Sequence, residues 1–99
     1  MSKGHQTSFE VYIREQLFWQ YSFDKDEIRI GRVNVCDIIL PVKSVSRLHA
    51  LVERNGDSYS LTDKSTNGTF VEGERIDKVP LNDGDRFQIE HYFIVFSKR

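Results

Sequence analysis

The chain has 99 residues, of which 38% are hydrophobic and 29% are charged, and its formal net charge is −1. A chain of this length has room for one domain with a single core, and the composition excludes a disordered chain or a membrane-spanning segment. The near-neutral charge argues against bulk nucleic-acid binding, which requires a strongly cationic surface. We therefore expect one soluble domain that binds neither nucleic acid nor a membrane.

The first eight residues are polar and unpatterned, and we expect residues 1–8 to be a disordered extension before a domain over residues 9–98. Within that domain, short segments alternate apolar and polar residues with the period of two that is typical of β-strands. The predicted strands cover 9–13, 18–23, 27–30, 37–40, 49–54, 59–62, 69–71, 86–90 and 92–97. Apolar residues do not recur at helical spacing over two turns, so no helix is predicted.

Turn residues separate these segments. Asn55-Gly56 predicts a two-residue hairpin turn with positive φ at both positions. Glu72-Gly73 and Asp83-Gly84 mark further turns, and Pro41 ends the strand before it. Many short strands with frequent turns indicate an all-β fold, an antiparallel β-sandwich.

Three polar clusters interrupt the strands between residues 31 and 69. They are Gly31-Arg32, Ser46-Arg47-Leu48-His49 and Ser65-Thr66-Asn67-Gly68-Thr69. An arginine fork, a serine hydroxyl and loop amides suit a phosphate-sized anion, and an asparagine can pair with an extended backbone. Residues 29–47 contain four cations against a single carboxylate, a net charge of +3 in a chain whose total is −1. The pattern predicts a local anion site.

Each cluster also has a simpler interpretation. Arg32 can cap a turn or pair with Asp37, and Ser46 can be only a turn hydroxyl. Arg47 can act through its backbone while its side chain lies in water. Asn67 can serve only as the positive-φ residue of its turn. These alternatives remain open from the residues alone.

The remaining polar residues give no sign of catalysis. His5, His49 and His91 lack the spacing of metal ligands, and no nucleophile is paired with a base, so we expect neither an enzyme nor a cofactor or metal. The lone Cys36 is interpreted as a small packing residue. With no secretory signal and no internal disulfide, a cytoplasmic location is expected. Lys43 and Lys64 are surface charges or contacts for an acidic partner.

Taken together, six segments resemble the forkhead-associated (FHA) domain in their order and spacing, over roughly Phe9 to Lys98. They are Arg29-Ile30-Gly31-Arg32, Cys36-Asp37-Ile38-Ile39-Leu40, Val45-Ser46-Arg47-Leu48-His49, Leu61-Thr62-Asp63, Ser65-Thr66-Asn67-Gly68-Thr69-Phe70 and Leu81-Asn82-Asp83-Gly84-Asp85. The resemblance implies a sandwich of about eleven strands whose loops at one end bind phosphothreonine in an extended partner segment. It implies a module for phosphorylation-dependent protein-protein interaction in signalling.

The resemblance also implies a role for each site residue. Arg32, the Ser46 hydroxyl and a nearby amide would contact phosphate oxygens, and Arg47 would add charge or an amide. Asn67 would bond the peptide backbone, and Thr66 would line the site near the phosphothreonine methyl group. Three further residues would support the site structurally: Gly31, His49 and Gly68.

Two residues depart from the family pattern. Glu72 stands where the family has asparagine before glycine, and a carboxylate cannot donate as an amide does, so we expect the bracing between loops to differ. Its charge is also expected to repel an acidic peptide. Glu90 stands where the family commonly has a glycine after the strand that begins beyond Gly84-Asp85. We interpret Glu90 as a residue of a solvent-facing edge.

A rival interpretation is a phospho-independent scaffold or oligomerisation module that uses the sheet faces. It rests on the aromatic run Phe18–Phe23, in which alternation places Trp19, Tyr21 and Phe23 on one face and Phe18 on the other. We expect these residues to belong mainly to the core. We also expect a monomer, with self-association left open.

Overall fold

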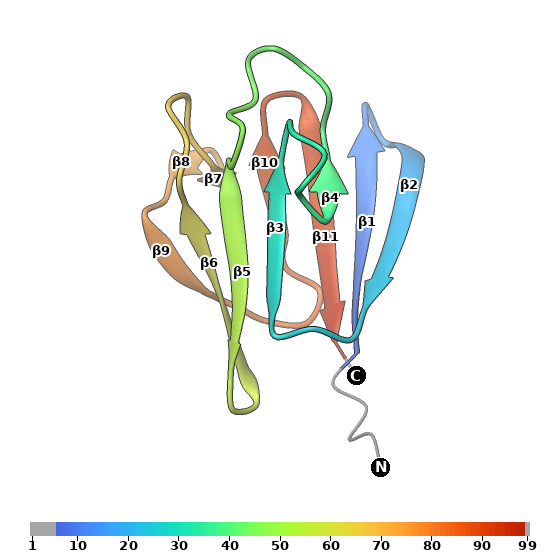
Figure 1. The fold of residues 1–99 in the computed structure, drawn as a ribbon, viewed down its shortest axis with the longest axis vertical. Helices are drawn as coiled ribbons and strands as arrows, with labels where there is room; N and C mark the ends of the chain where they lie inside the picture. The colour runs from blue at the N-terminus through green and yellow to red at the C-terminus, as the bar shows by residue number, and fades with distance from the viewer. Residues whose placement is uncertain (1–5, 99) are drawn as a thin grey trace.

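Eleven strands form two packed sheets in the computed structural model, which describes residues 6–98 (Figure 1). The six-stranded sheet has the order β2 (Gln16–Phe23), β1 (Thr7–Ile13), β11 (Tyr92–Lys98), β10 (Arg86–Ile89), β7 (Phe70–Val71) and β8 (Glu74–Arg75). The five-stranded sheet has the order β4 (Ile38–Ile39), β3 (Glu27–Gly31), β5 (Ala50–Asn55), β6 (Ser58–Asp63) and β9 (Lys78–Leu81). The all-β sandwich is confirmed. Within the described residues, no helix is long and apolar enough to cross a membrane.

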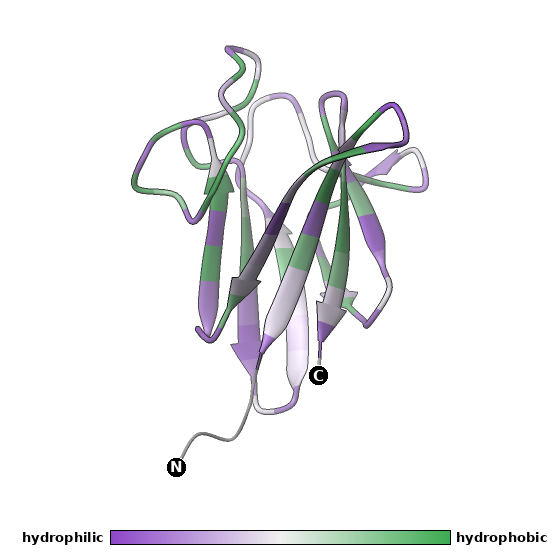
Figure 2. Ribbon diagram, turned by 90° about the vertical axis from the view of Figure 1, so that its right-hand side faces the viewer, coloured by the Kyte–Doolittle hydropathy of each residue, from purple (hydrophilic) through white to green (hydrophobic). Residues whose placement is uncertain are grey.

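The core lies between the two sheets and follows from the alternation of the strands. Phe9 of β1 and Phe96 of β11 are fully buried, with ring centroids 5.4 Å apart. Ile30 of β3 and Leu61 of β6 are equally buried in the opposite sheet. Figure 2 shows hydrophobic and hydrophilic segments alternating along the strands. Strands that bury every second residue on one face produce this arrangement.

The domain begins earlier than the sequence pattern predicted. β1 starts at Thr7, which is buried and pairs with Lys98 of β11 and Phe23 of β2. Ser8 pairs in the same ladders. The predicted disorder of residues 1–8 is therefore wrong for Thr7 and Ser8. Strand pairing extends on the N-terminal side of Phe9, the first apolar residue of the strand. Residues 1–5 lie outside the described part of the chain.

The β5–β6 hairpin lies where it was predicted, but its turn is shifted by one residue. Asn55 remains in β5 and pairs with Ser58, so the two turn residues are Gly56 and Asp57. Among the described residues of this turn, Gly56 alone has a positive φ, at 67°. A glycine at the first turn position followed by an ordinary residue is the type II′ pattern. The predicted pair of positive φ angles at Asn55-Gly56 is therefore wrong.

Glu90 occupies a tight turn and does not lie on an edge strand. β10 ends at Ile89, which pairs with Tyr92, so Glu90 and His91 form a two-residue connection to β11. The φ of Glu90 is 54°, in the left-handed region that favours glycine. This conformation explains why the family pattern has glycine here.

Replacing Glu90 with glycine is expected to stabilise the domain by about 0.5–1 kcal/mol. Glycine avoids the roughly 1–2 kcal/mol cost of a left-handed L-residue, while the greater freedom of the unfolded chain offsets part of this gain. The melting temperature should rise by about 2–8 °C in a calorimetric scan. Glu74→Gly, in β8 and outside the left-handed region, is the control and should lower it. A lower melting temperature for Glu90→Gly would contradict the assignment of strain.

The aromatic run forms β2, an edge strand of the six-stranded sheet. Trp19 lies opposite Val11, and the ladder is bulged at Phe18, which has no partner residue. Phe18 and Trp19 are 49% and 38% exposed, whereas Tyr21 and Phe23 pack against the core. The expectation that the run is core therefore holds only for its second half, since the first half lies at the bulge of an edge strand and is exposed.

Candidate functional site

The three polar clusters lie in loops at one end of the sandwich. The loops follow β3, precede β5 and follow β6, all in the five-stranded sheet. Figure 1 shows these connections together beyond the upper ends of the strands. Residues that are 14 to 38 positions apart in the chain are therefore brought to one surface, as the resemblance implied.

Gly31 allows β3 to pack directly against the serine loop. A Cβ atom at this position would lie 2.1 Å from the carbonyl oxygen of Arg47 and 2.9 Å from the sulfur of Cys36. The next amide, of Arg32, donates to the carbonyls of Ser46 and Arg47, both at 3.1 Å. Any side chain at position 31 would separate these two segments, so the predicted structural role of Gly31 has a steric cause.

The Arg32 side chain is anchored at one nitrogen and open at the others. Its Nε donates to the carbonyl of Val45 at 2.9 Å, and the side chain is half-buried. Within residues 6–98, its two terminal nitrogens have no hydrogen-bond partner. Asp37 instead pairs with Lys25 and accepts from the Arg29 amide. Pairing of Arg32 with Asp37 is thus not observed, and the guanidinium presents a pair of donors at the loop surface.

His49 links the serine loop to the loop after β6. Its ring is fully buried; Nδ1 accepts from the Ser46 amide at 3.0 Å, and Nε2 lies 2.8 Å from the carbonyl of Gly68. Because Nδ1 is the acceptor, the proton resides on Nε2, which donates to Gly68. The Ser46 amide is therefore already engaged, and Ser46 has only its hydroxyl to offer a ligand.

The Ser46 hydroxyl and the Asn67 side chain each connect two loops. The oxygen of Ser46 accepts from the Thr66 amide at 3.1 Å, which leaves the hydroxyl proton to be donated elsewhere. The Nδ2 of Asn67 donates to the Ser44 carbonyl at 2.9 Å. Its Oδ1 then faces away from this bond, as an acceptor for a peptide N–H group. Thr66 and Asn67 are exposed.

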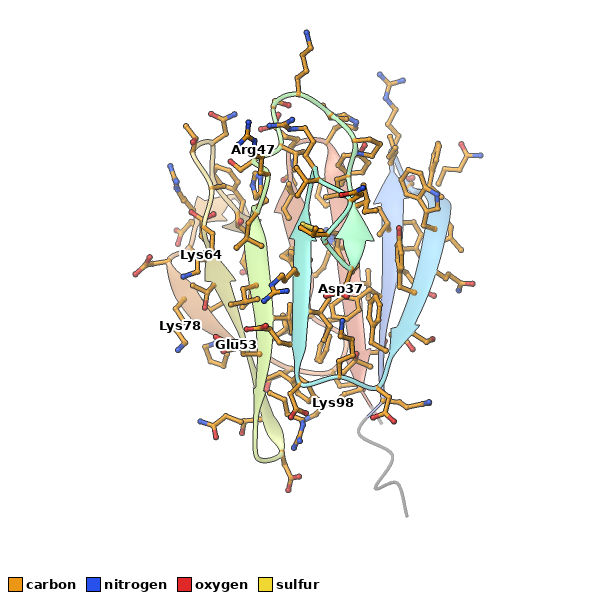
Figure 3. All side chains as sticks on the ribbon, in the orientation of Figure 1. Asp37, Arg47, Glu53, Lys64, Lys78 and Lys98 are labelled. Carbon is orange, nitrogen blue, oxygen red and sulfur yellow. The ribbon has the colours of Figure 1, made fainter. Side chains whose placement is uncertain are left out.

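Gly68 and Arg47 complete the set of predicted residues. Gly68 has a φ of 106°, and a Cβ atom there would lie 2.8 Å from the Phe70 ring, so no other residue fits without a shift. The carbonyl of Arg47 accepts from Arg32 and from the thiol of Cys36, at 3.1 and 3.3 Å. The Arg47 side chain is exposed and lies at the loop end of the domain (Figure 3). Its backbone is structural, and its charge is available to a ligand.

Cys36 contributes to this packing as a thiol. It is buried, and burial raises the pKa of its thiol above the usual value. The protonated form donates to the Arg47 carbonyl, which agrees with the predicted packing role. A thiol with this environment is a poor nucleophile.

The sequence analysis did not identify the residue that organises the loop after β6. Asp63 has a side chain only 7% exposed, and its Oδ1 accepts from the amide and hydroxyl of Ser65 and from the hydroxyl of Thr69. Its Oδ2 accepts two bonds from Arg75, which also donates to the Ser65 carbonyl. One carboxylate thereby holds both ends of the loop that carries Thr66 and Asn67. Serine and threonine at positions two and six beyond an aspartate are the signal that could have revealed it.

These bonds keep Asp63 ionised. Burial by itself would raise the pKa of its carboxyl group, but the hydrogen bonds from Ser65, Thr69 and Arg75 outweigh burial and hold the pKa below its usual 3.8. A carboxyl group whose pKa is lowered by folding stabilises the fold at pH values above its pKa in the unfolded chain. That contribution is lost as the pH falls through the folded pKa.

Asp63→Asn is therefore expected to destabilise the domain by about 1–3 kcal/mol at neutral pH, since the amide loses the charge-assisted bonds and faces Arg75 with a donor. The difference in unfolding free energy between wild type and variant should shrink as the pH is lowered below about 4, where the unfolded carboxylate is protonated. Denaturant titrations over a pH series measure this. A difference that stays constant down to acidic pH would contradict the role of the ionised carboxylate.

Glu72 has a local role in its turn. It joins β7 to β8 with Gly73, and the φ values of the two residues are 51° and 83°. Its exposed side chain forms no hydrogen bond within residues 6–98. The loops are instead braced by the bonds of Ser46, His49, Asn67 and Asp63, so an amide at position 72 is not needed to join them.

The arrangement can bind an anion. Within residues 6–98, no group of histidine, cysteine and acidic residues is placed to hold a metal ion. The loops instead gather an arginine fork, a serine hydroxyl and an asparagine carbonyl that are held by neighbouring backbone. Arginine and serine donors together with an asparagine acceptor, at one end of a β-sandwich, suit an anionic, extended segment.

Comparison with known proteins identifies the family. The family model of the FHA domain matches residues 28–90, and the chain belongs to this family. FHA domains are protein-interaction modules, and both the predicted family and the predicted fold are confirmed.

Individual relatives agree. The chain is 44% identical over 71 residues to the ABC transporter ATP-binding/permease protein Rv1747 of Mycobacterium tuberculosis, a match covering 71% of this chain and 8% of that protein. The structure of Mycobacterium tuberculosis EmbR in complex with a low affinity phosphopeptide has a TM-score of 0.82 and 34% identity, covering 94% of this chain and 24% of that one. A structure from work on phosphothreonine-dependent FHA domain interactions has a TM-score of 0.82 and 26% identity, covering 95% of this chain and 97% of that one. The chain thus spans a small part of the first two relatives.

Proposed function

We propose that this domain binds a phosphothreonine-containing segment of a partner protein and so makes an interaction depend on phosphorylation. The observation that carries the proposal is the Arg32 guanidinium, anchored through Nε while its terminal nitrogens remain open beside the serine loop. A phosphorylated side chain carries about −1.5 to −2 charges and three acceptor oxygens, which matches several convergent donors. The phosphopeptide complex of the related EmbR structure supports the same use of this fold.

Each site residue has a defined part in this proposal. Arg32 and the Ser46 hydroxyl donate to the phosphate oxygens, and Arg47 adds positive charge. The Oδ1 of Asn67 accepts from a backbone N–H group beside the phosphothreonine, since its Nδ2 is held by Ser44. Thr66 lines the site near the methyl group of the ligand. None of these groups forms a nucleophile paired with a base, so we expect the domain to bind the phosphate without hydrolysing it.

The proposal also covers the setting of the interaction. The partner carries phosphothreonine, and a cytoplasmic location is consistent with the free thiol of Cys36. The EmbR structure with its phosphopeptide, and the structure from work on phosphothreonine-dependent FHA domain interactions, favour this function over a phospho-independent scaffold.

Selectivity for threonine over serine tests the geometry of the site. Burying one methyl group is worth only about 0.8 kcal/mol, or about fourfold in affinity. We expect a larger preference, of more than about tenfold, because the methyl group also restricts the rotamer that carries the phosphate to Arg32 and Ser46. Calorimetric titration should compare matched phosphothreonine, phosphoserine and unphosphorylated peptides. Equal affinity for the two phosphopeptides would refute the rotamer argument, and equal affinity for all three would refute the proposed function.

A further inference from the structure

The charges around the site are divided between the two sheets. The loops of the five-stranded sheet carry four cations: Arg32, Lys43, Arg47 and Lys64. The corresponding turns of the six-stranded sheet carry three carboxylates and one arginine: Glu72 between β7 and β8, Glu90 between β10 and β11, and Arg14 with Glu15 between β1 and β2. A ligand that crosses this end of the domain therefore passes from a basic side to an acidic side.

The cations are available to a ligand. Lys43, Arg47 and Lys64 are exposed, and within the described residues none of them forms an ion pair. The carboxylate nearest to the loop after β6, that of Asp63, is already neutralised by Arg75 at 3.1 Å. Asp77, whose carbonyl accepts from the Asp63 amide, adds one exposed carboxylate on this side. The basic side therefore keeps an excess of positive charge.

The same cations adjoin the groups assigned to the ligand. Lys43 precedes Ser44, whose carbonyl holds Asn67, and the backbone of Lys64 donates to the carbonyl of His49 at 2.8 Å. Figure 3 shows Arg47 at the loop end and Lys64 beside β6, nearer the middle of the sandwich, while Lys98 lies near the opposite end. Residues that flank a phosphothreonine bound at Arg32 thus meet these side chains on one flank.

We infer that the domain selects phosphothreonine segments with acidic residues on one flank only, the flank that crosses the loops of the five-stranded sheet. This inference rests on the proposed function. On the other flank, Glu72 and Glu90 disfavour acidic residues through like-charge repulsion. An exposed ion pair changes affinity by about 1.4- to fivefold, so several such pairs give a preference that binding assays resolve. The attraction weakens as salt screens it.

Fluorescence anisotropy with four phosphothreonine peptides tests the inference. The peptides carry three glutamates before the phosphothreonine, three glutamates after it, glutamates on both flanks, or neutral flanks. We expect one single-flank peptide to bind about three- to tenfold more tightly than the neutral peptide, and the other to bind no better than neutral. The preference should diminish at high salt. The doubly acidic peptide should bind more weakly than the favoured one.

Charge reversal identifies the residues responsible. Lys43→Glu combined with Lys64→Glu should abolish or invert the preference, whereas Lys98→Glu, at the far end of the sandwich, should leave it unchanged. Equal gains from both acidic flanks, or no gain from either, would overturn the inference while phosphorylation-dependent binding persisted. Loss of any difference between phosphorylated and unphosphorylated peptides would instead overturn the proposed function itself.

Discussion

Replacing Arg32 with alanine is expected to weaken binding of a phosphothreonine peptide by about ten- to a hundredfold. A hydrogen bond to a charged group contributes about 1.5–3 kcal/mol, and tenfold in affinity corresponds to about 1.4 kcal/mol. The open nitrogens of Arg32 are the only part of the side chain left for a ligand, since Nε is held by the Val45 carbonyl. Calorimetric titration of wild type and variant measures the change.

Two further variants test whether the loss of affinity is specific to the guanidinium group of Arg32. Arg32→Lys keeps one positive charge but loses both the anchoring bond and the planar fork, so it should recover only a small part of the affinity. Arg29→Ala removes an exposed arginine of β3 that pairs with Glu27, and it should bind as wild type does. Unchanged affinity in Arg32→Ala would remove Arg32 from the site, whatever the other variants show.

Replacing Gly31 with alanine is expected to lower the unfolding free energy by about 2–6 kcal/mol and to reduce phosphopeptide binding at least as much as Arg32→Ala. The new methyl group would lie 2.1 Å from the Arg47 carbonyl oxygen, a backbone atom that no rotamer change can move. Overpacking costs about 1–3 kcal/mol, and the displaced Arg32 amide and Cys36 thiol lose bonds worth about 0.5–1.5 kcal/mol each. Denaturant unfolding and calorimetric titration give the two values.

A control substitution at a second glycine separates the effect of a steric conflict from the effect of replacing a glycine that has a positive φ. Gly56 has a positive φ of 67° and open space around its missing Cβ atom, and it lies in the β5–β6 turn. Gly56→Ala should destabilise the domain by about 1 kcal/mol through backbone strain while phosphopeptide affinity stays at the wild-type value. Binding that survives in Gly31→Ala would contradict the close packing of β3 on the serine loop.

The sequence could predict most of the fold because alternation of buried and exposed residues is a local signal. Strands such as β1, β5 and β11 bury every second residue and were recognised directly. β8 consists of Glu74 and Arg75 alone, and β9 contains Pro80, so neither has the composition of a strand. Their pairing depends on neighbouring strands, which the alternation of a single segment does not encode.

The candidate site was predictable in part. Gly31, Arg32 and Ser46 lie at or near strand ends, and the resemblance to the FHA domain implied that the loops that carry them lie at one end of the sandwich. The hydrogen bonds from Arg75 to Asp63 could not be predicted from the sequence. They join residues that are brought together only when β7 and β8 fold beside β6. The engagement of the Ser46 amide by His49 likewise depends on ring orientation, which sequence does not specify.

The aromatic run shows a different limit. Alternation correctly places Tyr21 and Phe23 against the core, but it carries no information on where the opposite sheet ends. Phe18 also falls at a bulge, where the period of two is interrupted. Exposure of the first half of β2 therefore could not be derived from the pattern.

The three loops are joined to one another by hydrogen bonds made entirely within the chain, from Thr66 to Ser46, from His49 to Gly68 and from Asn67 to Ser44. A ligand is not needed to form these bonds, so the donors are held in position before an encounter. Association should then proceed in a single step, with an observed rate that rises linearly with peptide concentration and does not level off. Among peptides of equal charge, differences in affinity should consequently lie in how long each complex lasts.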